Sequence, residues 1–218
     1  MSLVGCPTRF YDCSVNSALP ANFTHLHVHS HYTLLGATPS IDELVARARA
    51  DGLSQLALTD SDALFGAVSF ARACRAAAVR PIIGLTVPVA LPAGDLPPDA
   101  QATPGRLVLL AAEPAGYRAL CRLASLCQGD ADRERRRRAG LAWSELRAHA
   151  AGLIGLTGGR ADWLERFLRA GNGPAATRYV AQLGGLFGER CCLAVSPDLM
   201  AGDRSLGEAI VALGRRFG

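Results

Sequence analysis

Short apolar runs alternate with amphipathic stretches along most of the chain, and this alternation is the main indication of the fold. The apolar runs predict strands at residues 24–29, 55–59, 80–90, 106–111, 153–157 and 191–196. Strands that alternate with helices predict an α/β fold with parallel strands. Because no Gly-x-Gly-x-x-Gly motif follows any of these strands, a barrel fits better than a dinucleotide-binding sheet.

Helix signals fill most of the segments between the predicted strands. Ser40-Ile41-Asp42-Glu43 forms a capping box that predicts a helix start, and Pro114 predicts another. Further helices are predicted at residues 66–78, 143–150, 161–170, 175–187 and 205–217. Trp143 and Trp163, at two predicted helix starts, are expected to be packing residues.

Three segments show neither the helical nor the strand pattern of hydrophobic residues. Residues 1–22 are predicted to be a flexible leader, residues 91–105 a proline-rich loop and residues 130–138 a charged loop. The charged loop ends in four consecutive arginines, Arg135–Arg138, which could meet DNA phosphates or form a solvated surface. Because no aromatic residues interleave the arginines, the solvated surface is favoured.

The composition fits one domain with a sizeable core. The chain has 218 residues, of which 50% are hydrophobic, and its net charge of +4 does not by itself indicate nucleic-acid binding. Its seven cysteines include no Cys-x-x-Cys pair, which favours reduced thiols in the cytoplasm. No apolar run has the length of a membrane span, and no secretion signal is recognisable at the N-terminus.

Four of the five histidines occupy alternate positions in one segment: His25, His27, His29 and His31. In a strand, alternate side chains point to one face, so several imidazoles would converge there. Imidazole is a common ligand for zinc, manganese and iron. The alternative is a histidine-lined barrel floor that holds no metal, because two ligands are too few for a tight site.

Several motifs resemble, in order, those of one known family. His25-Leu26-His27-Val28-His29-Ser30 resembles the opening motif of the PHP (polymerase and histidinol phosphatase) domain, in the version found at the N-terminus of bacterial DNA polymerase III alpha subunits. Further similar stretches follow at residues 41–44, 57–68, 80–84, 107–111 and 116–120. The resemblance covers residues 23–218. It implies a distorted barrel of the (β/α)7 type, truncated before its last strand, so that residues 23–218 would form a PHP domain that is incomplete at its C-terminal end.

The resemblance also implies a metal cluster, and many of its ligands are replaced here. His27 and His29 match the first two ligands. The family has Asp, His and Glu at three positions occupied here by Gly36, Ser61 and Thr86, none of which is a good ligand for these ions. His31, Asp60 and Asp62 could partly compensate for the loss. Any zinc, manganese, iron or magnesium ion is therefore expected to be bound weakly or not at all.

The resemblance predicts the N-terminal PHP domain of a replicative or error-prone polymerase with a degraded metal site and a scaffold role. Its expected partners are the palm, thumb and fingers of the parent chain, a proofreading exonuclease subunit, and DNA through the parent chain; no membrane is expected. One alternative is a metal-dependent phosphoesterase or 3′–5′ exonuclease with His27, His29 and Asp60 at its core. Another is an interaction module with no role in nucleic-acid chemistry.

Overall fold

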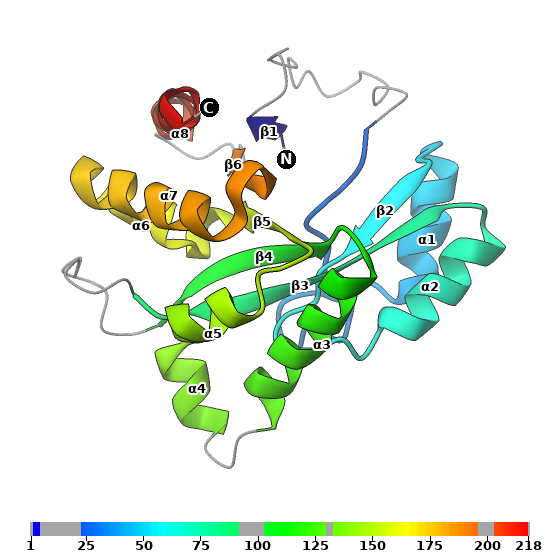
Figure 1. Ribbon diagram of the computed structural model, residues 1–218. Coiled ribbons are helices and arrows are strands. Elements are labelled where there is room, and N and C mark those ends of the chain that lie inside the picture. Colours follow the sequence, from blue (N-terminus) through cyan, green and yellow to red (C-terminus); the bar gives the residue numbers. More distant parts are fainter. Residues whose placement is uncertain (1, 5–22, 92–102, 130–132, 196–202, 218) are drawn as a thin grey trace.

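A computed structural model describes residues 2–4, 23–91, 103–129, 133–195 and 203–217 (Figure 1). Its strands form one curled, open sheet with the order β1-β6-β5-β4-β3-β2. The α/β class predicted from the sequence is therefore confirmed. The strands are β1 (Ser2–Val4), β2 (Gln55–Leu58), β3 (Arg80–Val89), β4 (Gly105–Ala111), β5 (Leu153–Thr157) and β6 (Cys191–Val195).

The strand directions differ from the prediction of a parallel sheet. β2 runs parallel to β3, and β5 runs parallel to β6. β4, however, is antiparallel to both β3 and β5, and β1 is antiparallel to β6. For β3 and β4, the proline-rich sequence that connects them gives a physical reason. Neighbouring parallel strands need a crossover, usually a helix, whereas a simple return loop joins antiparallel strands.

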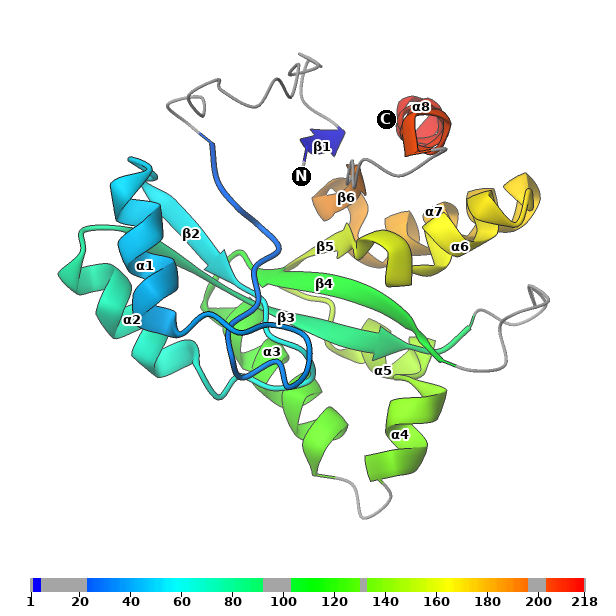
Figure 2. The ribbon, with the colours of Figure 1, turned by 180° about the vertical axis from the view of Figure 1, so that it is seen from behind.

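Helices cover the sheet on both sides and at one end (Figures 1 and 2). The pair α1–α2 lies beside β2, α3 packs on β3 and β4, and α8 lies near β1 and β6. The helices are α1 (Ile41–Ala50), α2 (Ala67–Ala76), α3 (Pro114–Gln128), α4 (Arg133–Ala139), α5 (Trp143–Ala148), α6 (Trp163–Arg169), α7 (Gly173–Phe187) and α8 (Asp203–Phe217). Short 3₁₀ turns occupy Gly159–Ala161 and Gly188–Arg190.

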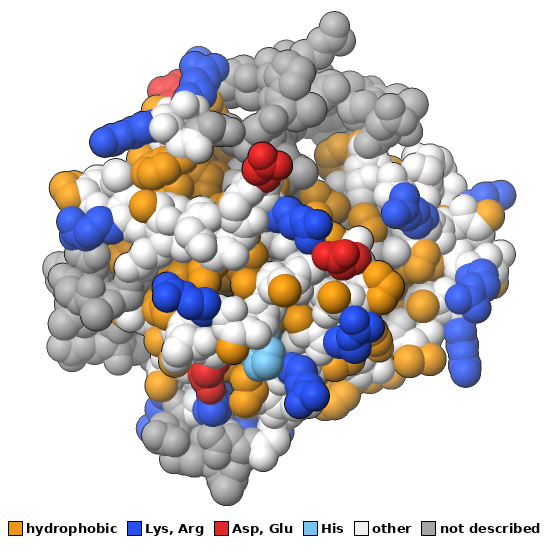
Figure 3. Space-filling view, in the orientation of Figure 1, with side chains coloured by type: hydrophobic (Ala, Val, Ile, Leu, Met, Phe, Trp, Pro, Cys, Tyr) orange, Lys and Arg blue, Asp and Glu red, His pale blue; other side chains and the backbone are white. Residues whose placement is uncertain are grey.

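The predicted charged loop is wrong over most of its length, because Arg133–Ala139 is helical. Within this helix, Arg136 forms an ion pair of 2.7 Å with Glu145 on α5, and Arg138 pairs with Glu134 one turn earlier. These pairs offset part of the repulsion among consecutive arginines that the sequence suggested. Figure 3 shows basic side chains scattered over this face of the molecule, without one concentrated patch.

The capping box predicted at Ser40 is confirmed and starts α1. The Ser40 hydroxyl accepts from the Glu43 N–H, and the Glu43 carboxylate accepts from the Ser40 N–H at 2.7 Å. Two of the free backbone donors at the helix start are thus satisfied. The buried face of α1 then packs through Ile41, Val45 and Ala48.

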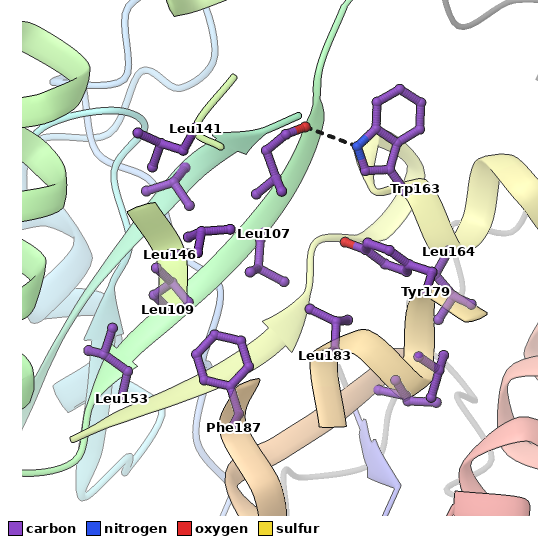
Figure 4. Packing of buried hydrophobic residues seen from close by; sticks show 14 of the residues in the cluster. Leu107, Leu109, Leu141, Leu146, Leu153, Trp163, Leu164, Tyr179, Leu183 and Phe187 are labelled. Carbon is purple, nitrogen blue, oxygen red and sulfur yellow. Dashed lines mark hydrogen bonds between the residues drawn. The ribbon is translucent and has the colours of Figure 1, made fainter. Parts of the chain in front are cut away.

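The largest hydrophobic cluster lies between β3, β4 and β5 and the helices α3, α6 and α7 (Figure 4). Trp163 is buried in it, as expected for a packing residue, and its indole N–H donates to the Val89 carbonyl at 2.9 Å. Phe167 stacks on Trp163, and Tyr179 meets Phe167 edge-on. The cluster joins β3 to α6 and α7, and so fixes the sheet from which the candidate site is built.

Two segments near the N-terminus differ from their predictions. Three residues of the predicted leader, Ser2–Val4, form β1 against β6, and residues 5–22 lie outside the described part of the chain. The predicted strand at residues 24–29 does not form a regular strand: the backbone bends at His27, and the one strand-type bridge joins His25 to Leu56. The proline-rich loop at residues 91–105 also lies largely outside the described residues, although Gly105 already belongs to β4.

Candidate metal centre

The histidine-rich segment lies along the free edge of β2. The Ala57 N–H donates to the His25 carbonyl at 3.0 Å, and the Thr59 N–H donates to the Val28 carbonyl at 2.7 Å. The Thr59 hydroxyl closes a third link by accepting from the Val28 N–H at 2.9 Å. These bonds hold the segment against β2, although it is too irregular to count as a strand.

His27 and His29 face each other, as the alternating pattern suggested. Their Nε2 atoms are 2.8 Å apart, and both imidazoles are partly buried. Burial, together with the neighbouring His29, lowers the pKa of His27 to about 4. Burial also lowers the pKa of His29, although the charge of Asp60 opposes this effect. Both shifts favour the neutral imidazole, which is the form that can bind a metal.

Asp60 follows β2 and is only 3% exposed. One carboxylate oxygen accepts from the Ser30 N–H at 2.6 Å and from the Thr33 hydroxyl at 2.8 Å. The other oxygen accepts from the Ser30 hydroxyl at 2.7 Å. Hydrogen bonds within the chain therefore engage both oxygens that could have served as metal ligands.

Asp62 is directed toward a different partner. Its carboxylate accepts from the Arg106 guanidinium at 2.7 Å, and its carbonyl accepts from the Gln128 side chain at 3.0 Å. Its backbone has a φ of 64°, a left-handed conformation that is uncommon for residues other than glycine. The structure thus places Asp62 in an ion pair between β4 and the end of β2, not beside the two histidines.

The remaining histidines of the segment are exposed. His31 stacks on Tyr32 with ring centroids 4.4 Å apart, and His25 lies edge-on to Phe23. Neither residue joins His27 and His29 in a group of ligands, because the described residues contain no cluster of three or more His, Cys, Asp or Glu side chains placed to hold an ion.

The resemblance implies lost metal ligands at Gly36, Ser61 and Thr86. In the structure, each of these residues forms a hydrogen bond that holds the surrounding loops and strands together. The Ser61 N–H donates to the Thr33 hydroxyl at 3.0 Å, and the Thr86 hydroxyl donates to the Thr59 carbonyl at 2.8 Å. The Gly36 N–H donates to the Thr33 carbonyl at 3.0 Å. Thr33 contacts two of these three residues, and sequence reasoning missed it. The available signal was its place four residues after His29, where a hydroxyl can bond locally.

The donor set does not fit a centre of several metal ions. Such a centre needs carboxylates that bridge the ions, and here Asp60 accepts three hydrogen bonds from Ser30 and Thr33 while Asp62 is paired with Arg106. Two imidazoles bound to one tetrahedral ion at about 2.0–2.1 Å would also hold their nitrogens roughly 3.3 Å apart. The observed separation of 2.8 Å is closer to a direct hydrogen bond between the rings.

Comparison with known proteins identifies the family. The sequence profile of the PHP domain matches residues 25–197, which is most of the chain. The chain belongs to the PHP domain family. The histidine segment, β2 with Asp60, and β3 with Thr86 all lie inside the matched region.

Curated relatives of this PHP chain are polymerase subunits. The DNA polymerase III subunit alpha of Bacillus subtilis is 33% identical over 197 residues, which cover 90% of this chain and 16% of the relative. The error-prone DNA polymerase of Mycobacterium bovis is 42% identical over 101 residues, or 46% of this chain and 9% of the relative. The chain therefore spans about one sixth, or less, of the relatives it matches.

A solved structure supports the fold. A protein from Bifidobacterium adolescentis, described as a metal-dependent phosphoesterase, superimposes with a TM-score of 0.54 at 13% sequence identity. The alignment covers 91% of this chain and 85% of the other. At this identity the likeness supports the PHP-like α/β architecture alone. Among the helices that the structure describes, none combines the length and hydrophobicity needed to span a bilayer.

Proposed function

We propose that this chain acts as the N-terminal PHP domain of a DNA polymerase III alpha-like polymerase, with a structural role in place of a hydrolytic one. The observation that carries the proposal is the set of three hydrogen bonds that Asp60 accepts from Ser30 and Thr33. A carboxylate that accepts three hydrogen bonds inside the chain has little capacity left to bind ions or to activate water. Metal binding at His27 and His29 is accordingly proposed to be weak.

The relatives support the polymerase context of this proposal. Polymerase alpha subunits and an error-prone polymerase both match the chain, so the replicative and the error-prone branches remain equally supported. The proposed partners are the polymerase body, a separate proofreading exonuclease, and DNA through the polymerase. The same context would place the protein in the cytoplasm, where its cysteines would stay reduced.

Metal content and hydrolysis test the structural role. The 218-residue chain would be purified without added metal, together with the variant His27→Ala/His29→Ala and the matched control His149→Ala, which removes the one histidine outside the cluster. Elemental analysis is expected to find zinc, manganese and iron well below one ion per chain in all three proteins. Hydrolysis of bis(p-nitrophenyl) phosphate and of single-stranded DNA from its 3′ end is expected not to differ among them.

The opposite result would support the main alternative, a metal-dependent phosphoesterase or 3′–5′ exonuclease. Near-stoichiometric metal that disappears only in the double variant, with hydrolysis that disappears in parallel, would refute the structural role. The polymerase context has a separate test in the gene. A reading frame that continues past Gly218 into polymerase sequence is expected, and a stop codon directly after Gly218 would contradict that part of the proposal.

A further inference from the structure

We infer that Thr33 and Asp60 are positioning residues that lock the two facing imidazoles through one directed chain of hydrogen bonds, from His27 to His29 to Thr33 to Asp60. In this arrangement a proton lies between the two Nε2 atoms, where an ion would otherwise bridge them. The inference follows from the hydrogen-bonding capacity of each group in the chain. It holds whether or not the domain belongs to a polymerase.

The chain of bonds ends at Asp60, which can only accept. The Ser30 N–H, the Ser30 hydroxyl and the Thr33 hydroxyl all point their hydrogens at its carboxylate, at 2.6, 2.7 and 2.8 Å. An ionised carboxylate has no hydrogen to donate, and three donors at these distances match the ionised form. The single hydrogen of the Thr33 hydroxyl is therefore committed to Asp60.

The hydroxyl of Thr33 then determines the proton on His29. Its oxygen has two lone pairs, of which one accepts from the Ser61 N–H at 3.0 Å. The other faces Nδ1 of His29, also at 3.0 Å. Because the Thr33 hydrogen is already used, this contact is a hydrogen bond only when His29 carries its proton on Nδ1.

The tautomer of His29 in turn determines that of His27. A neutral His29 protonated on Nδ1 presents a bare Nε2, and this atom lies 2.8 Å from Nε2 of His27. Two bare nitrogens at this distance would repel each other through their lone pairs. His27 must therefore carry its proton on Nε2 and donate it to His29.

In this arrangement hydrogen bonds hold the two imidazoles, which need neither a metal ion nor a carboxylate in direct contact with them. Each contact along the chain of bonds pairs a donor with an acceptor, and the backbone N–H groups of Ser30 and Ser61 complete the network. An ion that bound both Nε2 atoms would have to move the proton of His27 and also separate the two rings. Thr33 and Asp60 therefore oppose ion binding indirectly, through the proton positions that they impose on the two imidazoles.

Imidazole nitrogen NMR tests the assignment. Two-bond 1H–15N correlation spectra of metal-free, 15N-histidine-labelled protein at neutral pH report which nitrogen of each ring is protonated. Single replacements of His27 and His29 assign the signals. The expected pattern is Nε2–H for His27 and Nδ1–H for His29. A wild-type spectrum with His29 protonated on Nε2 would overturn the inference.

Variants of Thr33 separate positioning from simple structural support. Thr33→Val removes the hydroxyl and is expected to shift His29 away from the Nδ1–H tautomer, whereas Thr33→Ser keeps the hydroxyl and is expected to keep the wild-type pattern. An unchanged His29 tautomer in a folded Thr33→Val protein would contradict the inference. If Thr33→Val does not fold, the wild-type and Thr33→Ser spectra still decide the matter, since each must show the stated pattern.

A zinc titration keeps this inference distinct from the proposed function. Stoichiometric zinc binding by the wild-type chain would refute the structural role, but the tautomers are measured without metal and would stand. Conversely, a wrong tautomer would overturn the hydrogen-bond chain and leave the metal-content result unaffected.

Discussion

Asp162 offers the sharpest test of the energetics of the fold. It caps the start of α6 and is completely buried. One carboxylate oxygen accepts from the Tyr179 hydroxyl at 2.6 Å and from the Trp163 N–H at 2.7 Å, while the other has no hydrogen-bond partner among the residues that the structure describes. Burial raises the pKa of Asp162 from 3.8 to about 7, against the opposing effect of the bond from Tyr179.

The sign of the pH dependence follows from this shift. Between pH 3.8 and about 7 the folded chain keeps the Asp162 proton while the unfolded chain has lost it. The free energy of unfolding therefore falls as pH rises through this range, and the loss is complete above about pH 7. The full difference in pKa corresponds to roughly 4 kcal/mol, of which roughly 2 to 3 kcal/mol falls between about pH 5 and about pH 8.

The substitution Asp162→Asn removes this titration and keeps the shape of the side chain. We expect the variant to gain roughly 2 to 3 kcal/mol relative to wild type as pH rises from about 5 to about 8. Urea unfolding followed by tryptophan fluorescence at several pH values, under reducing conditions, measures both proteins. The difference between the two proteins at each pH removes the titrations that they share, and the cost of the unpaired amide adds a constant, so the change of this difference with pH reports Asp162.

A flat difference between the two proteins over this pH range would refute the reasoning. Tyr179→Phe provides an independent check. It removes a hydrogen bond that lowers the pKa of Asp162, so the pH dependence should persist and extend to higher pH. If Tyr179→Phe instead abolished the pH dependence, the titrating group would not be Asp162.

Two further predictions concern packing and capping. Gly116→Ala should lower the free energy of unfolding by about 1–3 kcal/mol, because the added Cβ would collide with the Gly152 carbonyl. The control Gly184→Ala adds a Cβ to a helix position with open space, and should be neutral or stabilising by up to about 1 kcal/mol. Equal effects of the two substitutions in urea unfolding would contradict the clash. Ser40→Ala should lower the free energy of unfolding by about 1 kcal/mol because it removes the helix cap, whereas Ser40→Asp should keep most of the capping stabilisation. Equal thermal stability of the two variants would argue against the cap.

Local signals predicted the helices well because their causes are local. The capping box at Ser40, the proline at the start of α3 and the apolar periods place most helices within a few residues of their observed bounds. Arg133–Ala139 is the exception, since four consecutive arginines were interpreted as a solvated loop. The ion pair of Arg136 with Glu145, on the next helix, is a tertiary contact that the run itself does not reveal.

Strand direction was predicted less well because it depends on the connections. The prediction of parallel strands assumed that a helix follows every strand, but the connection between β3 and β4 shows no helical period, and these strands are antiparallel. The histidine segment failed as a strand for a related reason. It has an edge position with one isolated bridge, and periodicity does not distinguish an edge segment from a fully paired strand.

At the candidate site, matching residues to the family's metal ligands predicted only part of the arrangement. The sequence predicted that His27 and His29 would face each other, and the structure places them so, but it could not show that Asp60 and Asp62 would have different partners. Those partners are Ser30, which lies in the family motif but is not a metal-ligand type, and Thr33 and Arg106, which neither metal chemistry nor the motif selects. Whether the five predicted metal-ligand candidates bind an ion in solution stays a prediction.

The replaced ligands and the observed hydrogen bonds support one physical account. Bridging carboxylates and a third histidine would hold positive ions, and once those ligands are absent, a buried carboxylate needs other donors to remain ionised. Ser30 and Thr33 supply such donors to Asp60, while Arg106 supplies a fixed positive charge to Asp62. Fixed hydrogen bonds and a guanidinium thus neutralise the site at the end of β2, so the fold there can be stable without an exchangeable ion.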